Sequence, residues 1–192
     1  MSSEKRHAWL EAATHALRDR FAAAGFTVPD AVRVSIGIPK GSHGRTKTIG
    51  QCWGAEASSD KHYEVFISPE LSSSVRILGV LAHELAHATV GTAAGHKGPF
   101  KRCAEAIGLA GPMTSTTETA AFTTWADVLV DASLGPYPAG SLDLGSRKKQ
   151  TTRLLKCECE ECGYTVRITR KWLESVGAPL CPADEIPMCT AS

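Results

Sequence analysis

A helical segment that carries two histidines constrains this chain more than any other feature. Residues 72–90 read SSSVRILGVLAHELAHATV, and apolar side chains recur there with the 3.6-residue period of an α-helix. One of the three serines at the start can cap this helix. The apolar stripe contains Val75, Leu78, Ala82, Leu85 and Thr89. His83 and His87 are four residues apart and share one helix face, so both imidazoles can reach a single ion.

The elements expected around this helix are those of an α+β protein. In chain order they are a helix at 8–24, strands at 32–38, 49–57 and 63–69, and further helices at 100–107 and 118–134. We expect neighbouring strands to pair antiparallel in one short sheet.

A change of composition separates this part of the chain from its C-terminal end. Gly, Pro and Ser dominate the sequence GPYPAGSLDLGSRKK, and we interpret 135–150 as a linker. Five of the seven cysteines fall after position 156. The expected organisation is therefore a first domain at 1–134, the linker, and a small metal-binding module at 151–192.

The overall composition is that of a globular cytoplasmic protein. Hydrophobic residues make up 43% of the chain, charged residues 21%, and the net charge is +1. The sequence contains no apolar run close to the roughly 20 residues that span a bilayer, and its N-terminal segment lacks the apolar core of a signal peptide. In a reducing compartment, clustered cysteines more often bind metal than form disulfides. We therefore expect a cytoplasmic protein without a membrane partner.

The two helical histidines and their acidic neighbour have the spacing of a catalytic zinc site. His83 and His87 can hold one ion, and Glu84 lies beside that ion, where a carboxylate can move protons. A catalytic zinc has three protein ligands and one open position. We expect His96 to be the third ligand, because the GTAAG sequence lets the chain turn back after the helix.

Other choices of the third ligand fit the sequence less well. A metzincin places its third histidine six residues after the second, and Ala93 occupies that position here. Glu105 and Glu118 are the alternatives if a downstream glutamate is used. Glu105 lies in KRCAEAIG, where a solvated helix face is the simpler interpretation, so His96 is preferred.

The order HELAH, then GHKGPF, resembles the SprT-like family of zinc metallopeptidase domains, particularly its small bacterial and phage-type members. IGQCW, EVFISP and GLAGPMTSTT also look like that family. The resemblance implies a zincin-like fold with an N-terminal helix, a short antiparallel sheet and an HExxH helix. It also implies zinc on the three histidines and Glu84 as the general base. One departure is Lys97, which lies between His96 and Gly98 where the family more often has the glycine directly.

The C-terminal cysteines have the spacing of a zinc ribbon, which SprT-like proteins commonly carry after the protease domain. The expected ligands of this structural zinc are Cys159, Cys162, Cys181 and Cys189. The first two form C-x-x-C followed by glycine, the shape of a zinc knuckle. The second knuckle is irregular, because Asp184 stands where a second cysteine is usual. Cys189 is preferred as the fourth ligand because thiolate is favoured at structural sites, with Asp184 or Cys157 as alternatives.

Basic residues around the ribbon form a candidate nucleic-acid surface. They are Arg147, Lys148, Lys149, Arg167, Arg170 and Lys171. Tyr164 and Trp172 lie among them and could stack on bases. Glutamates are interspersed with these cations, so a mixed solvated surface explains the pattern equally well.

Together these features predict a zinc-dependent metalloprotease with one catalytic and one structural zinc. The expected substrate is a protein. The resemblance implies that the substrates are DNA-associated proteins, because characterised eukaryotic relatives cleave proteins crosslinked to DNA. The ribbon is then the candidate DNA-binding part. The alternative is a non-catalytic zinc protein whose ribbon binds nucleic acid or a transcription complex.

Overall fold

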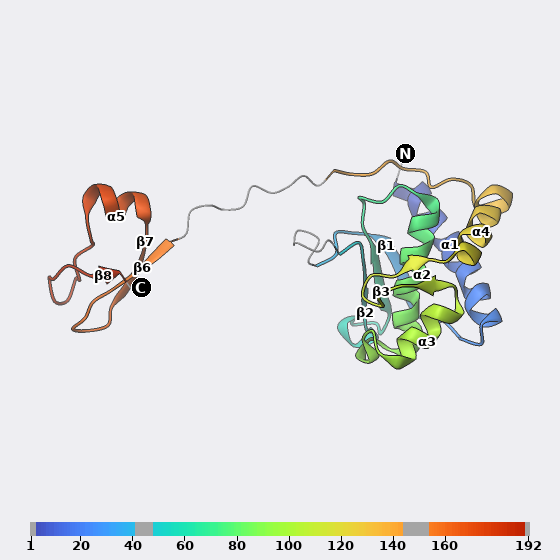
Figure 1. Ribbon diagram of the computed structural model, residues 1–192, viewed down its shortest axis with the longest axis horizontal. Helices are drawn as coiled ribbons and strands as arrows, with labels where there is room; N and C mark the ends of the chain where they lie inside the picture. Colours follow the sequence, from blue (N-terminus) through green and yellow to red (C-terminus); the bar gives the residue numbers. More distant parts are fainter. Residues whose placement is uncertain (1–2, 41–47, 144–153, 191–192) are drawn as a thin grey trace. The chain divides into compact units, whose positions relative to one another are not determined.

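The computed structural model describes residues 3–40, 48–143 and 154–190, which belong to two compact units, Met1–Gly145 and Ser146–Ser192 (Figure 1). Helices and small sheets occur together, which confirms the α+β class. Among the described residues, none of the helices has the length and apolar character needed to cross a membrane.

The sheet of the first unit has three strands, β1 (Val32–Ile36), β2 (Gly50–Trp53) and β3 (Tyr63–Ile67). Their order is β1-β3-β2, so β3 is central. β2 runs antiparallel to β3, but β1 runs parallel to it. The expectation of a purely antiparallel sheet was therefore wrong. The connection from β1 to β3 contains β2 and returns the chain to the end of the sheet where β1 begins, which is what a parallel pair requires.

The helices of the first unit are α1 (Ser3–Ala23), α2 (Ser74–Val90), α3 (Gly98–Ala106) and α4 (Ala120–Leu129), which continues as a π-helical turn at Val130–Leu134. Two-residue strands β4 (Leu109–Ala110) and β5 (Thr117–Glu118) pair between α3 and α4. The helix expected from residue 118 begins later. Thr119 caps it by accepting a hydrogen bond from the Phe122 amide, and Glu118 lies in β5 instead.

The histidine-bearing helix α2 is the centre of the first unit. It contacts β2 and β3 of the sheet and also α1, α3 and α4 (Figure 1). Ser73 caps its N-terminus, and Gly91, with a φ of 83°, follows its last residue. The fully buried side chains of α2 include Ile77, Leu78, Leu81 and Leu85. Burial on this scale fixes the orientation of the helix, and with it the direction of the two histidines.

Part of the predicted linker belongs to the first unit. Trp9 donates from Nε1 to the carbonyl oxygen of Gly135 at 2.9 Å, and its ring meets that of Tyr137 edge-on, with centroids 5.2 Å apart. The amide of Leu142 donates to the carbonyl of Pro69 at 2.8 Å. The linker at 135–150 was therefore predicted to begin too early. Its Gly, Pro and Ser content indicated a linker, and no local pattern predicts the contact of Tyr137 with Trp9, which lies more than a hundred residues away in the sequence.

The second unit is a small three-stranded sheet with one short helix. β6 (Leu154–Glu158) lies between β7 (Thr165–Thr169) and β8 (Cys189–Thr190), and both pairs are antiparallel. The helix α5 (Arg170–Val176) follows β7 directly. The buried core consists of Cys157, Cys159, Cys181 and Met188. Because most of these residues are cysteines, apolar burial alone offers this unit little stability.

Candidate metal centres

Three imidazoles converge in the first unit, as the sequence predicts. The Nε2 atom of His96 lies 3.2 Å from Nε2 of His87 and 3.3 Å from Nε2 of His83. A tetrahedral zinc with nitrogen ligands at 2.0–2.1 Å would separate them by about 3.3 Å. The donor set and its spacing therefore fit a zinc ion. Among the described residues, this group contains the three histidines and no other His, Cys, Asp or Glu.

A single buried aromatic ring supports all three histidines. Phe100 in α3 is fully buried, and its centroid lies 4.8 Å from that of His83, 4.3 Å from that of His87 and 5.0 Å from that of His96. His96 follows a short 3₁₀ turn and Gly95, whose φ of 53° turns the chain back toward α2. The role of Phe100 was not foreseen from the sequence, although it lies only four residues after His96.

The histidines are held in the form that binds metal. Burial lowers the pKa of His83 to about 3, with neighbouring His87, His96 and Arg76 adding to the effect. Burial, followed by the charge of His96, lowers the pKa of His87 to about 4. Burial also lowers the pKa of His96. At neutral pH all three rings are therefore uncharged and carry a lone pair for a cation.

Glu84 is a buried carboxyl next to this site. Glu84 is 6% exposed, and its burial raises the pKa of the carboxyl to about 8. A backbone hydrogen bond from Cys52 lowers this pKa by a smaller amount. β2 passes so close to the carboxyl that a Cβ built on Gly50 would lie 2.5 Å from Glu84 Oε1. A carboxyl whose pKa is near neutral can both accept and release a proton, which general acid–base catalysis requires.

These groups line an open cavity of about 660 Å³. Its walls come from the segment around β2, from α2, from the turn after α2 and from the loop before β5. They include Thr48, Gln51, Arg76, Thr92, Thr114 and Ser115. The two glutamates considered as alternative ligands lie elsewhere. Glu105 is exposed and pairs with Lys101 at 3.7 Å, and Glu118 pairs with Arg76 at 2.7 Å. Neither joins the histidines.

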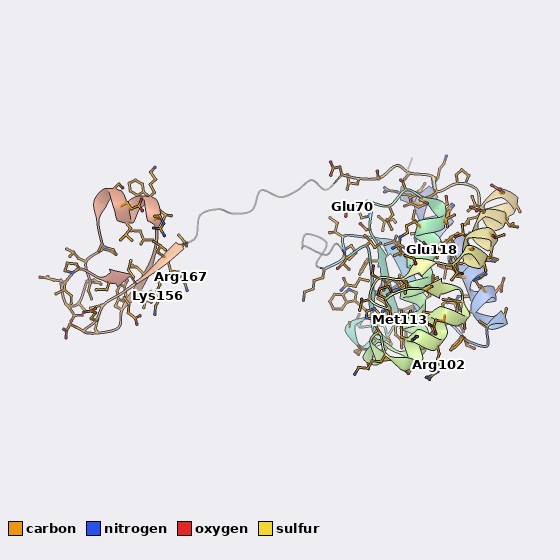
Figure 2. The ribbon with its side chains drawn as sticks, viewed as in Figure 1. Glu70, Arg102, Met113, Glu118, Lys156 and Arg167 are labelled. Carbon is orange, nitrogen blue, oxygen red and sulfur yellow. The ribbon has the colours of Figure 1, made fainter. Side chains whose placement is uncertain are left out.

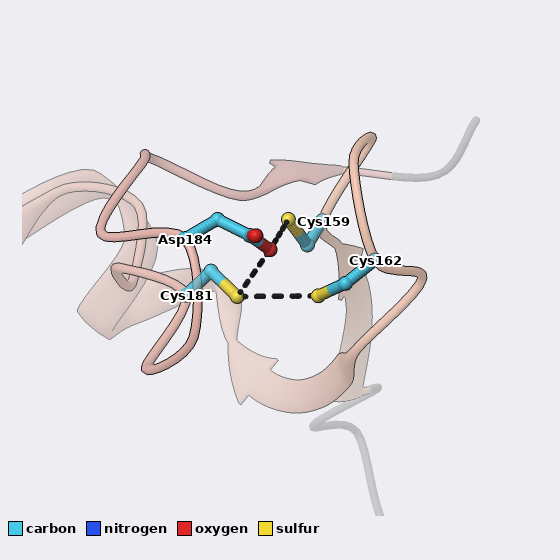
Figure 3. Close-up of side chains that lie close together, drawn as sticks. All are labelled: Cys159, Cys162, Cys181 and Asp184. Atoms are coloured by element: carbon cyan, nitrogen blue, oxygen red, sulfur yellow. Dashed lines mark hydrogen bonds between the residues drawn. The ribbon is translucent and has the colours of Figure 1, made fainter.

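A second group of metal-ligand atoms occurs in the C-terminal unit (Figure 3). Asp184 Oδ2 lies 3.1 Å from Cys159 Sγ and 3.2 Å from Cys181 Sγ, and Cys162 Sγ lies 3.5 Å from Cys181 Sγ. Hydrogen bonds from the three thiols, that of Cys162 first, lower the pKa of the Asp184 carboxyl. The group fits a tetrahedral structural zinc, with one carboxylate and three thiolates as ligands.

The preferred fourth ligand, Cys189, is not part of this group, and neither is Cys157. Cys189 lies on β8 opposite Glu158 and is exposed, whereas Cys157 lies on β6 and is fully buried. The sequence argument ranked ligands by chemical preference. In the fold, Asp184 and not Cys189 is the fourth member of the group, because Asp184 lies in a turn that faces the other thiols whereas Cys189 lies in strand β8.

The turns that carry the two halves of this group are built alike. In the first, the Gly163 amide donates to the Cys159 carbonyl at 3.0 Å, and Gly163 has a φ of 74°. In the second, the Glu185 amide donates to the Cys181 carbonyl at 2.9 Å, and Glu185 has a φ of 54°. Asp184 thus occupies the position that Cys162 has in the first knuckle. The equal spacing of C-x-x-C and C-x-x-D was the sequence signal for this ligand.

The candidate nucleic-acid residues are only partly described. Arg147, Lys148 and Lys149 lie outside the described residues. Arg167, Arg170 and Lys171 are exposed, but Arg170 pairs with Glu174 at 3.6 Å and Lys171 lies over the ring of Trp172. Arg167 lies opposite Lys156 across β6 and β7 (Figure 2), and Lys156 pairs with Glu158. The described cations are therefore mixed with acidic partners and do not form one uninterrupted positive face.

Comparison of the chain with protein-family models, with curated proteins and with solved structures finds no match.

Proposed function

We propose that the first unit is a zinc-dependent peptidase. The observation that carries this proposal is the buried Glu84 carboxyl beside three convergent histidines, at the wall of an open cavity. A structural zinc site is closed by four protein ligands, whereas these histidines leave one position for water or substrate. A structural site also has no use for a buried carboxyl of raised pKa next to it.

The proposed reaction is hydrolysis of a peptide bond by water. Zinc, when bound by His83, His87 and His96, would supply Lewis-acid chemistry, making water more acidic and polarising the scissile carbonyl. Glu84 would accept the proton from the attacking water and later donate it to the leaving amine. Burial raises the pKa of this carboxyl in the metal-free site, and a bound cation beside it would favour the carboxylate form that accepts the proton.

The sheet offers a way to hold a peptide in the cavity. β2 pairs with β3 on one side, and no described strand pairs with its other side. Residues 48–52, on and before β2, line the cavity. An extended peptide could therefore add to this edge by main-chain hydrogen bonds, with its backbone beside the histidines. This arrangement favours a protein or peptide substrate over a small hydrolysable molecule.

Substitution of Glu84 by glutamine tests the proposal. Glu84→Gln keeps the size of the side chain but removes its proton chemistry, so we expect unchanged zinc content and a loss of about 100-fold or more in kcat. Glu105→Gln, an identical change at an exposed position on α3, is the matched control and should retain full activity. Cleavage of an unfolded protein substrate by Glu84→Gln at the wild-type rate would refute the proposal.

DNA-associated proteins remain a proposed substrate class that rests on the resemblance to SprT-like domains. Exposed Tyr164 and Trp172 in the ribbon favour contact with single-stranded nucleic acid. Acidic side chains outnumber basic ones among residues 154–190, which weakens that contact. DNA binding that falls steeply with added salt would support this part of the proposal, and no binding at low salt would remove it.

A further inference from the structure

A threonine outside the metal-binding motif contacts one of the three histidines. Thr116 lies in the loop before β5, thirty-three residues from His83 in the sequence, and is only 5% exposed. Its Oγ1 atom lies 2.9 Å from Nδ1 of His83. Nε2 of the same ring faces His96. The hydroxyl therefore contacts the ring nitrogen that faces away from the other histidines.

Helix α2 itself holds Thr116 in place. Arg76 Nη1 donates to the carbonyl oxygen of Thr116 at 3.2 Å and to Glu118 Oε1 at 2.7 Å. Arg76 lies two helical turns before His83, so the two side chains project from the same face of α2. Glu118 fits against the helix because residue 79 is glycine, where a Cβ would lie 1.8 Å from Glu118 Oε1. Arg76 and His83, the two side chains that contact Thr116, thus both belong to helix α2.

We propose that Thr116, fixed by Arg76 and Glu118, is a positioning residue that holds His83 as a metal ligand. A neutral imidazole carries one N–H. If Nδ1 donates that hydrogen to Thr116 Oγ1, Nε2 keeps its lone pair for the metal, and the ring cannot turn without breaking the bond. The proposal rests on metal binding by the three histidines and does not depend on peptidase activity.

The proposal is tested by measuring zinc affinity of the full chain in competition with a chelator. Thr116→Val removes the hydroxyl at constant size, and we expect the histidine site to bind zinc about 10–100-fold more weakly. Thr116→Ser keeps the hydroxyl and should retain most of the affinity. The matched control is Thr117→Val, the same change at the next, exposed residue, which should bind as the wild type does.

Cobalt separates the two metal centres in the same samples. Cobalt bound by the ribbon gives thiolate charge-transfer absorption, whereas the histidine site lacks sulfur ligands. The thiolate bands should therefore be identical in every variant, and only the weaker bands of the histidine site should change. Wild-type affinity in Thr116→Val, or an equal loss in Thr117→Val, would overturn the proposal.

Two further measurements guard against a variant that misfolds. In Arg76→Met the Thr116 carbonyl loses its donor, so we expect weaker zinc binding whose effect is less than additive with that of Thr116→Val. Nitrogen NMR of the chelator-treated wild-type protein should show His83 protonated on Nδ1. Additive effects would overturn the role of Arg76, and an Nε2-protonated His83 would overturn that of Thr116.

Discussion

Glu84 can occupy its buried position because the strand opposite has no side chain there. A Cβ on Gly50 would lie 2.5 Å from Glu84 Oε1 and 2.6 Å from Val80 Cγ1. Neither neighbour can withdraw easily, since both lie on the buried side of α2. The glycine is therefore needed for the space it leaves and not for an unusual backbone angle.

Gly50→Ala is expected to displace the Glu84 carboxyl while leaving the histidines in place. A displacement of about 1 Å in a catalytic group can cost about 100-fold in rate, so we expect a loss of that order in kcat with normal zinc content. Gly140→Ala is the control, because a Cβ there would meet nothing within 4 Å. Peptidase assays and elemental analysis of both variants check this. Full activity in Gly50→Ala would mean that the carboxyl tolerates displacement.

The pKa of Glu84 also makes a prediction for stability. In chelator-treated protein, the folded state holds the Glu84 proton up to a pH of about 8, whereas the unfolded chain releases it near 4.5. Stability from this group is therefore present at low pH and lost as the pH rises between these values. The slope is at most about 1.4 kcal/mol per pH unit for one proton.

Urea unfolding of wild type and Glu84→Gln across this pH range measures the effect. The variant has no carboxyl to titrate, so the wild type should lose stability relative to it as the pH rises. The histidines act in the opposite direction, because their lowered pKa values cost stability as the pH falls below about 6.5. Both proteins share that contribution, and it cancels in the difference. A difference that is independent of pH would contradict the assigned pKa shift.

The sequence identifies candidate metal ligands well where they are close along the chain. His83, His87 and His96 lie within fourteen positions, and helical periodicity places the first two on one face. Thr116 and Gly50 could not be predicted in the same way. Thr116 lies 33 residues from His83 and Gly50 lies 34 from Glu84, and only the folded chain brings the pairs together.

At the scale of elements, the turn at residues 181–185 shows how the backbone selects a candidate ligand. Its hydrogen bonds match those of the first knuckle, and Glu185 adopts the positive φ that Gly163 has there. A non-glycine residue is strained in this conformation, by about 1–2 kcal/mol. The turn persists with this strain, which indicates that contacts around Asp184 and Cys181 stabilise it.

Substitutions in the ribbon distinguish the two candidates for its fourth ligand. Asp184→Ala should weaken zinc binding by the ribbon about 100-fold or more, because a binding free energy of about 10–16 kcal/mol is shared among four ligands. Cys189→Ser should leave the affinity unchanged. Asp184→Cys should restore or exceed the wild-type value, since thiolate is the stronger structural ligand. Zinc competition assays test all three, and loss of zinc in Cys189→Ser alone would return the role to Cys189.

The sheet of the first unit marks the limit of prediction for elements. Alternating apolar residues located all three strands, but the order β1-β3-β2 depends on which edges meet after the chain has turned twice. The parallel pairing of β1 with β3 leaves no local pattern in the sequence. The position of α2 against the sheet, in contrast, follows from its apolar stripe.

For the whole molecule, the two units differ in what holds them together. The first has a large apolar core formed by α1, α2, the sheet, α3 and α4, and this core consists of many side chains other than the candidate ligand histidines. The second has four buried core residues, of which Cys159 and Cys181 are also candidate ligands. We therefore expect the first unit to fold without zinc, whereas the ribbon needs its ion to fold.

This difference bears on how long the chain would survive in a cell. When zinc is scarce, the ribbon would unfold and expose Met188 and the backbone around it, and unfolded segments are where degradation begins. The first unit would remain intact but lack its ion. Under the proposed function, zinc supply would then set the lifetime of the protein through one unit and its activity through the other, although the two candidate sites offer different ligands.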